Sequence, residues 1–185
     1  MQPASDFPVV IVLAAGRGER FAASGGKVHK LQARLAGKPV IEHVMDAVRA
    51  SGLEFHVVGA HVSRPGMGDS IASGVNATPD AAGWLILPAD LPLIRAETLM
   101  AMARCAEGAV AVPLFQGQKG HPVRFSAACR ADLLNLKGNG GAAHVVKAHA
   151  AMNSVVFVPV EDAGTVTDID TVQDLARAEA WLAAR

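Results

Sequence analysis

A glycine-rich segment with two arginines follows the first apolar run of this sequence. Residues 13–21 read Leu-Ala-Ala-Gly-Arg-Gly-Glu-Arg-Phe, so small side chains leave the backbone N–H groups open to a ligand. Gly16 and Gly18 permit φ angles that other residues avoid, and Arg17 and Arg20 can pair with phosphate oxygens. The pattern is compatible with a phosphate-binding loop. A glycine-rich turn whose arginines are only solvated fits the composition equally well.

Two common phosphate-binding patterns are excluded at this position. A P-loop requires Gly-x-x-x-x-Gly-Lys followed by Ser or Thr, but Lys27 is followed by Val28. A dinucleotide-binding Gly-x-Gly-x-x-Gly pattern requires a third glycine where the sequence has Phe21. The segment therefore matches neither pattern, which mildly disfavours an enzyme that uses a nicotinamide cofactor.

Three aspartates have positions suited to binding a divalent cation. Asp90 follows a buried apolar run, between prolines that stiffen its loop, and its distance from the next expected helix is too long for a helix cap. Asp168 and Asp170 are two residues apart, so both side chains share one face of an extended segment. Carboxylates are ligands that Mg²⁺ prefers. For Asp170 we favour a different role, as the N-cap of the last helix with Gln173 completing a capping box.

The composition is that of a globular chain without net charge. The 185 residues suit one domain, 1–185; 51% of them are hydrophobic, and 17 Lys and Arg balance 17 Asp and Glu. This balance disfavours nucleic-acid binding, which usually needs a basic face. Cys105 and Cys129 form no metal or disulfide pattern and are expected to be small core residues. The apolar run at 9–15 is too short to span a membrane and lacks signal-peptide flanks, so we expect a cytoplasmic protein without membrane contact.

Apolar runs alternate with segments of helical periodicity along the chain. The expected strands are residues 9–13, 55–59, 84–87, 110–114, 121–125 and 155–158. The expected helices are residues 39–51, 68–75, 96–106, 127–136, 142–150 and 172–182. This alternation predicts an α/β protein in three α/β/α layers with a mostly parallel sheet. Ligands bind at the carboxyl ends of such strands, where residues 13–21 lie.

Several short motifs, taken in order, resemble one enzyme family. Residues 13–21 are followed by Lys30, within Lys-Val-His-Lys-Leu at 27–31, and by Leu-Ala-Gly-Lys-Pro-Val at 35–40. The later motifs are Gly-Met-Gly-Asp-Ser at 66–70, Pro-Ala-Asp-Leu-Pro at 88–92, Gly-His-Pro-Val at 120–123 and Asp-Ile-Asp-Thr at 168–171. This series is similar to that of the nucleotidyltransferases related to molybdenum-cofactor guanylyl- and cytidylyltransferases, and it spans nearly the whole chain.

The resemblance implies a Rossmann-like nucleotidyltransferase fold. It also implies that CMP passes from CTP to molybdopterin cofactor with release of pyrophosphate. CTP is favoured because the guanylyl branch tends to have glycine at the position of Ala15, and because the motifs at 66–70 and 120–123 resemble the cytidylyl branch. The implied partners are CTP or another NTP, a molybdopterin-type phosphorylated acceptor, and a molybdoenzyme or its chaperone.

The resemblance also assigns roles to individual residues. The implied catalytic residues are Lys30, Arg20 and Asp90. The implied nucleotide-binding residues are Leu13, Ala14, Ala15, Gly16, Arg17, Gly18, Lys30, Gly68, Ser70 and Asp90. Mg²⁺ is expected at Asp90 and Asp168, and the acceptor at His121 and Gly140. A solvated loop histidine remains an alternative for His121.

Two departures from the family pattern leave alternatives open. A loop that usually reads Gly-Asp-x-Gly-Ala-Arg has Asn139 and Ala143 in place of the aspartate and the arginine. One helix–strand unit is expected to be missing around residues 61–66. The alternatives are a sugar or polyol phosphate as acceptor, and a non-catalytic nucleotide-binding partner protein. The presence of Lys30, Asp90 and Asp168 together argues against the non-catalytic alternative.

Overall fold

Apolar, β-branched runs form the centre of a seven-stranded sheet in the computed structural model, which describes residues 6–59 and 66–184. In spatial order, its strands are β4 (Phe55–Val58), β1 (Val9–Leu13), β5 (Gly83–Pro88), β8 (Val123–Ser126), β6 (Val110–Phe115) and β7 (Gln118–Lys119), with β9 (Val155–Pro159) paired to β6. Hydrogen bonding is parallel for β1 with β4 and β5 and for β6 with β9, whereas β7 and β8 are antiparallel to their neighbours. Because β8 lies antiparallel to both β5 and β6, those two strands share a direction. The sheet is therefore mixed but mostly parallel.

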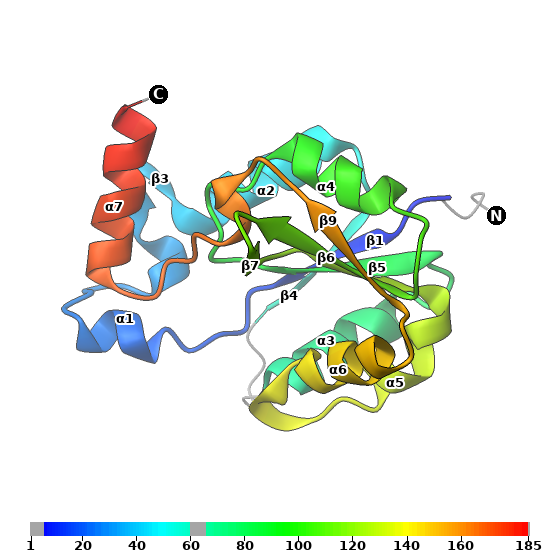
Figure 1. Ribbon diagram of the computed structural model, residues 1–185. Coiled ribbons are helices and arrows are strands. Elements are labelled where there is room, and N and C mark those ends of the chain that lie inside the picture. The colour runs from blue at the N-terminus through cyan, green and yellow to red at the C-terminus, as the bar shows by residue number, and fades with distance from the viewer. Residues whose placement is uncertain (1–5, 60–65, 185) are drawn as a thin grey trace.

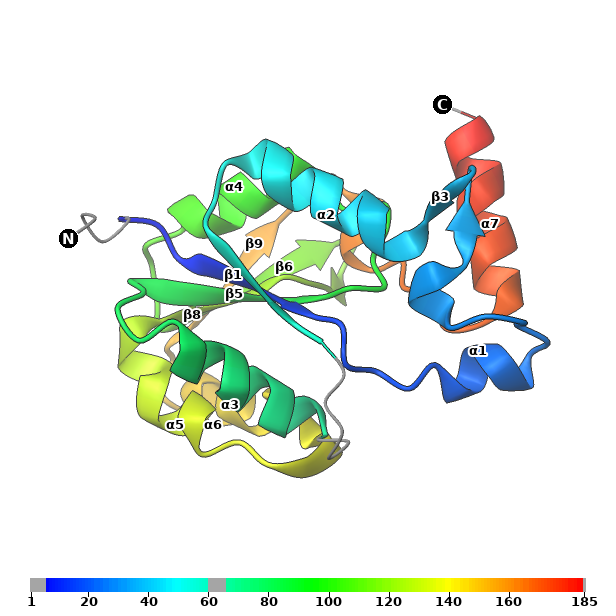
Figure 2. The same cartoon turned by 180° about the vertical axis from the view of Figure 1, so that it is seen from behind.

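Helices cover both faces of this sheet (Figures 1 and 2). One face has α2 (Val40–Ser51) and α4 (Ala96–Arg104); the other has α3 (Met67–Ala77), α5 (Arg130–Leu134) and α6 (Ala143–Ala151). Side chains alternate between faces along a strand. Val10 and Leu85 accordingly pack into one core cluster, while Ile11 and Trp84 pack into the other. The largely buried strands β1 and β5 position the loops at their ends. The predicted three-layer α/β/α architecture is confirmed.

A smaller group of elements lies beyond the carboxyl end of β1, to one side of the sheet in both views (Figures 1 and 2). It consists of α1 (Glu19–Ala23), η1 (Lys30–Gln32), β2 (Arg34–Leu35), β3 (Lys38–Pro39) and α7 (Val172–Ala183). The backbone N–H of Val172 donates to Ser24 Oγ at 2.9 Å, and that of Ala36 donates to Glu179 at 3.3 Å. These bonds fasten the first and last parts of the chain together around the loop at 14–30.

The element boundaries depart from the sequence-based expectations in a few places. The segment expected to be helical at 127–136 divides into η2 (Ala127–Cys129) and α5, and two further 3-10 turns occur, η3 (Gly138–Gly140) and η4 (Ala163–Thr165). The helix–strand unit expected to be missing around 61–66 falls almost wholly on residues outside the described ranges. Of the expected core cysteines, Cys129 is buried and Cys105 is partly exposed. Within the described ranges, no helix combines the length and apolar character needed to cross a bilayer.

Candidate nucleotide-binding site

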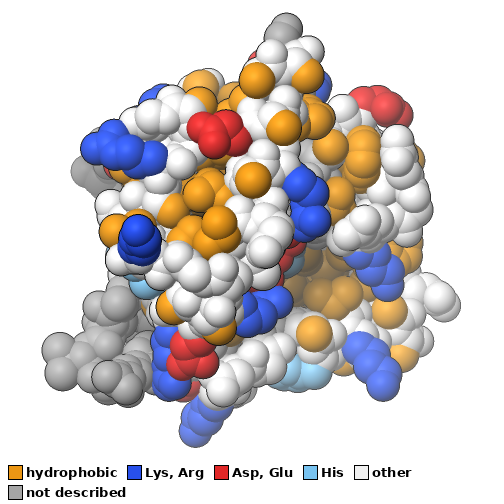
Figure 3. Space-filling model, turned by 90° about the vertical axis from the view of Figure 1, so that its left-hand side faces the viewer, with side chains coloured by type: hydrophobic (Ala, Val, Ile, Leu, Met, Phe, Trp, Pro, Cys, Tyr) orange, Lys and Arg blue, Asp and Glu red, His pale blue; other side chains and the backbone are white. Residues whose placement is uncertain are grey.

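A cavity of about 670 Å³ opens at the carboxyl ends of the central strands. Figure 3 looks at this side of the molecule, where Lys and Arg side chains gather around a hollow. The cavity is lined by residues from the loop after β1, the loop after β5, the start of α3, the β6–β7 hairpin and the segment before α7. Segments that are far apart in the sequence thus form one site, as expected for loops at this edge of a sheet.

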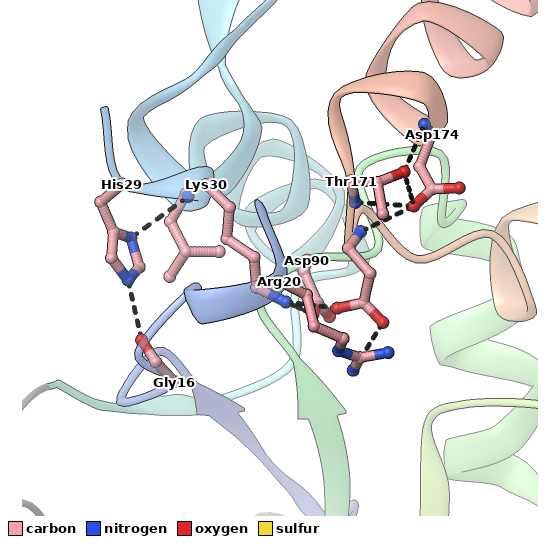
Figure 4. A network of polar contacts seen from close by, with 9 residues as sticks. Gly16, Arg20, His29, Lys30, Asp90, Thr171 and Asp174 are labelled. Carbon is pink, nitrogen blue, oxygen red and sulfur yellow. Dashed lines mark hydrogen bonds and ion pairs between the residues drawn. The ribbon is translucent and has the colours of Figure 1, made fainter. Parts of the chain in front are cut away.

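His29 fastens the glycine-rich loop to the turn that carries Lys30 (Figure 4). Its Nε2 lies 2.8 Å from the carbonyl oxygen of Gly16, and its Nδ1 accepts the backbone N–H of Leu31 at 3.3 Å. Because Nδ1 is the acceptor, the ring proton lies on Nε2, which donates to Gly16. The ring therefore fixes the loop at 14–18 relative to Lys30. Sequence reasoning assigned no role to His29.

Lys30 is the central cation of the site (Figure 4). Its Nζ donates to Asp90 Oδ2 at 2.6 Å and to Asp170 Oδ1 at 2.9 Å, and its side chain is only 12% exposed. Burial by itself acts to lower the pKa of Lys30, but the two carboxylates outweigh it and the pKa is raised above its usual value. The ammonium group is therefore charged and held in one place, where it can meet a triphosphate.

Asp168 and Asp170 interact with each other, and the interaction shifts the pKa of both carboxyl groups. Burial, followed by the hydrogen bond and the charge of Asp170, raises the pKa of Asp168. The pKa of Asp170 is lowered despite its burial, because Lys30, then a hydrogen bond with Asp168 and then the charge of Arg20 stabilise its charged form. Arg20 reaches Asp170 Oδ2 at 2.7 Å, and the backbone N–H of Ile169 donates to the carbonyl of Asp90 at 2.9 Å. That last bond holds the 168–170 segment against the end of β5.

The prediction that Asp170 caps the last helix is wrong. The N-cap of α7 is Thr171, whose hydroxyl oxygen accepts from Asp174 N at 3.1 Å, while Asp174 Oδ2 accepts from the backbone N–H of Thr171 at 2.7 Å. Asp174, not Gln173, thus completes the capping box. The one-residue shift frees the carboxylate of Asp170 to bind Lys30 and Arg20. Asp174 has the structural role in the first helical turn that its position predicts.

A second wall of the cavity is built on the β6–β7 hairpin and the turn after it. Gln118, Lys119 and His121 line this wall together with Thr165, whose carbonyl accepts the backbone N–H of His121 at 2.9 Å. Burial lowers the pKa of His121, against smaller opposing effects of the Ile86 backbone and the Asp90 charge. Its imidazole is therefore neutral at pH 7 and lies in the cavity wall, so it is not a freely solvated loop histidine.

Asp69 joins two loops that form the third wall. Its Oδ2 accepts the backbone N–H of Gly66 at 3.0 Å and that of Gly138 at 2.8 Å. The chains approach so closely that a Cβ added to Gly66 would lie 2.2 Å from the carbonyl carbon of Gly138. The two hydrogen bonds to Asp69 hold the 138–140 turn beside the start of α3, and Asn139 of this turn lines the cavity. Gly140 does not line it.

Most residues predicted for the site line this one cavity. They are Leu13, Ala15, Gly16, Arg17, Gly18, Arg20, Lys30, Ser70, Asp90, His121 and Asp168. Three do not line it: Ala14, Gly68 and Gly140. Ala14 donates its N–H to Val58 within the sheet, and Gly68 packs against the backbone of Lys137. Asp170 also lines the cavity but was expected to cap the last helix, and no ligand-binding role was predicted for the lining residues Gln118, Lys119 and Asn139.

Comparison with known proteins identifies the family. Residues 10–153 match the model of the MobA-like NTP transferase domain. The chain is 26% identical over 195 residues to the purine catabolism protein PucB of Bacillus subtilis (strain 168), across 92% of this chain and 95% of that protein.

Solved structures share the fold. A nucleotidyl transferase from Methanothermobacter thermautotroptrophicus (Mth528) superposes with a TM-score of 0.81 at 24% identity, covering 96% of this chain and 98% of that one. Rv0371c from Mycobacterium tuberculosis H37Rv, in complex with manganese, superposes with a TM-score of 0.73 at 20% identity, covering 93% of this chain and 97% of that one. The expected nucleotidyltransferase fold is thereby confirmed. With the family model matched over residues 10–153, this chain belongs to the MobA-like NTP transferase domain family of nucleotidyltransferases.

Proposed function

We propose that the protein transfers CMP from CTP to a molybdopterin-type phosphorylated acceptor and releases pyrophosphate. The observation that carries the proposal is the position of Lys30, which is held between Asp90 and Asp170 beside the glycine-rich loop. A buried ammonium and a pair of arginines next to open backbone N–H groups suit a triphosphate. A site that only had to bind a nucleotide would not need this buried lysine–carboxylate network as well.

The residues of the site can account for the transfer without a catalytic base. A phosphate oxygen of the acceptor attacks the α-phosphorus of CTP, a new P–O–P bond forms, and the bond to the β-phosphate breaks with its electron pair leaving on pyrophosphate. Positioning and charge neutralisation supply most of the catalysis in such reactions. Arg17, Arg20 and Lys30 would hold the triphosphate and stabilise the leaving pyrophosphate. Ser70 would contact the nucleotide from α3, and His121 the acceptor.

The carboxylates of the site fit a divalent cation, for which we propose Mg²⁺. Asp90 and Asp168 are the proposed ligands, and Asp170 lies close enough to Asp90 to share Lys30 with it. Burial, and next the neighbouring carboxyl group of Asp170, raises the pKa of Asp168. A bound cation would reduce the repulsion between the two carboxylates. The described residues hold no group of three or more His, Cys, Asp or Glu side chains in metal-binding geometry. Mg²⁺ commonly uses one or two carboxylates, water and substrate phosphates.

Mg²⁺ when bound would neutralise charge on the triphosphate. The manganese complex of Rv0371c supports a divalent cation in this fold. The ligands are tested by titrating Mg²⁺ into activity assays of Asp168→Asn and Asp170→Asn. We expect each variant to need a higher Mg²⁺ concentration for half-maximal rate, with Asp168→Asn the more affected. If only Asp170→Asn changes the Mg²⁺ requirement, Asp170 is the second ligand.

The nucleotide and the acceptor are tested together by measuring pyrophosphate release. Wild-type protein is assayed with CTP, GTP, ATP and UTP, each with molybdopterin cofactor, a sugar phosphate and a polyol phosphate. We expect release with CTP and molybdopterin cofactor. CTP should also bind at least about tenfold more tightly than GTP by calorimetry, roughly 1.4 kcal/mol. Equal binding would indicate a broad-specificity transferase, and nucleotide binding without release in any mixture would indicate a non-catalytic partner protein.

We propose that the chain works as one domain in the cytoplasm and delivers its product to a molybdoenzyme or its chaperone. The near-zero net charge supports a small-molecule acceptor rather than nucleic acid.

A further inference from the structure

The β6–β7 hairpin presents a lysine to the cavity on a tight turn. Phe115 pairs with Gln118 across the turn, and the two residues between them, Gln116 and Gly117, have φ angles of 48° and 83°. Two-residue turns with positive φ at both positions match the twist of the flanking strands, so they close hairpins tightly. Lys119 follows Gln118 on β7, so the turn fixes the position of its backbone. Lys119 also lines the cavity.

Lys119 differs from the other cations of the cavity in its partners. Arg17 pairs with Glu19, Arg20 pairs with Asp170, and Lys30 pairs with both Asp90 and Asp170. Among the described residues, no carboxylate forms an ion pair with Lys119. Its Nζ lies 5.1 Å from the centre of the Phe157 ring, a contact that orients the ammonium without neutralising its charge.

The positions of these cations along the sheet separate them. β7 continues the line of β8 along one edge of β6, while β9 occupies the other edge, so two strand spacings, β1 to β5 and β5 to the line of β8 and β7, lie between the glycine-rich loop and the backbone of Lys119. At about 4.8 Å per spacing this separation is roughly 10 Å, and the Lys119 side chain extends farther, across β6 to Phe157. This distance leaves room for the reacting α-phosphorus between a triphosphate at one end and a second phosphate at the other.

We infer that Lys119 binds the phosphate of the acceptor, with Gln118 beside it, as the anion subsite on the entering side of the reaction. The inference rests on the proposed function and names the substrate class of its second site, a phosphomonoester. In-line displacement requires the attacking oxygen to enter opposite the departing pyrophosphate. The triphosphate and the departing pyrophosphate are assigned to Arg17, Arg20 and Lys30. The charge of Lys119, which has no carboxylate partner among the described residues, is therefore assigned to the attacking phosphate of the acceptor.

The experiment measures binding of phenyl phosphate by calorimetry. The protein is first saturated with α,β-methylene-CTP and Mg²⁺ so that the triphosphate site is filled, and the titration is repeated without nucleotide. Lys119→Ala should weaken phenyl phosphate binding about tenfold or more and leave α,β-methylene-CTP binding within twofold of wild type. Lys119→Arg should restore most of the phenyl phosphate affinity. Lys147→Ala, an exposed lysine on α6 with the same charge change, is the control and should behave as wild type.

Each result decides the assignment. Equal phenyl phosphate affinity in wild type and Lys119→Ala, or no measurable binding to wild type, overturns the subsite. Equal losses of phenyl phosphate and nucleotide affinity place Lys119 in the nucleotide site and also overturn it. If phenyl phosphate binding depends on Lys119 but no nucleotide yields pyrophosphate, the subsite stands and the proposed transfer reaction fails.

Discussion

Lys30 and Asp90 are 60 residues apart in the sequence, yet Nζ of Lys30 lies 2.6 Å from Oδ2 of Asp90. The same nitrogen lies 2.9 Å from Oδ1 of Asp170, a further contact across 140 residues. One ammonium thus joins η1, the loop after β5 and the segment before α7. A charge held this way costs little reorganisation when a triphosphate or a cation arrives, which is the property expected of an electrostatic catalyst.

Replacement of Lys30 should abolish most of the activity. Lys30→Ala removes the cation at the centre of the site, and loss of one preorganised charged donor lowers kcat by about 100-fold or more. Steady-state pyrophosphate release measures the effect. Lys27→Ala, an exposed lysine three residues earlier, removes the same charge and should retain activity near wild type. Activity of Lys30→Ala within threefold of wild type would remove Lys30 from the mechanism.

Asp90→Asn should abolish transfer while leaving stability nearly unchanged. The substitution keeps the shape of the side chain, and Lys30 retains Asp170 as a partner. We expect the melting temperature to change by no more than about 3 °C, equivalent to roughly 1 kcal/mol for a chain of this size. Activity and melting temperature are measured on the same preparation. Normal activity would end the assignment of Asp90 to the cation, and a large loss of stability would identify a structural role.

Asp162 is expected to be a stabilising residue. It is 2% exposed, and its two oxygens accept from the backbone N–H of Arg95 at 3.0 Å, the hydroxyl of Thr98 at 2.7 Å and the backbone N–H of Gly164 at 2.9 Å. Asp162→Ala leaves these buried donors unpaired, at a cost of about 1–3 kcal/mol each.

The stability test for Asp162 uses thermal and urea unfolding. A loss of roughly 3 kcal/mol for Asp162→Ala corresponds to a fall in melting temperature of about 6–12 °C. Glu161→Ala, at the exposed neighbouring position, should change it by less than about 2 °C. Similar melting temperatures for the two variants would show that the Asp162 contacts contribute little to the folded state.

His121 should make the unfolding free energy depend on pH. Burial lowers the pKa of His121 in the folded protein below the ordinary 6.5. As the pH falls below 6.5, the unfolded chain therefore binds a proton that the folded protein does not, and stability decreases until the folded pKa is reached. Near pH 8, well above 6.5, both states are neutral at this residue and it contributes no slope.

Urea unfolding between pH 5 and 8 measures this dependence. His121→Asn should flatten the decrease below pH 6.5, whereas His144→Asn, at an exposed position on α6, should keep it. An unchanged slope in His121→Asn would mean that the His121 imidazole titrates alike in the folded and unfolded protein.

The sequence alone determined the longer strands and the helices α2 to α7, whereas α1 and the two-residue strands β2, β3 and β7 were not expected. β1 and β5 are short apolar runs that local composition identifies, and the small residues and arginines at 13–20 made that loop a candidate for phosphate binding. The motif order also identified the family, because each motif is contiguous. Local patterns of this kind depend on residues a few positions apart, so they are visible without the fold.

The tertiary structure decided which side chains meet. The sequence favoured Asp170 as the cap of the last helix, but α7 begins at Val172 with Thr171 as its cap, and the carboxylate of Asp170 binds Lys30 instead. Lys119 was recognised as a cavity-lining residue only from the structure, in which the β6–β7 hairpin forms one wall of the cavity. Such contacts join segments across long stretches of sequence, and they form only when sheet packing has fixed the loops. No pattern of neighbouring residues encodes them.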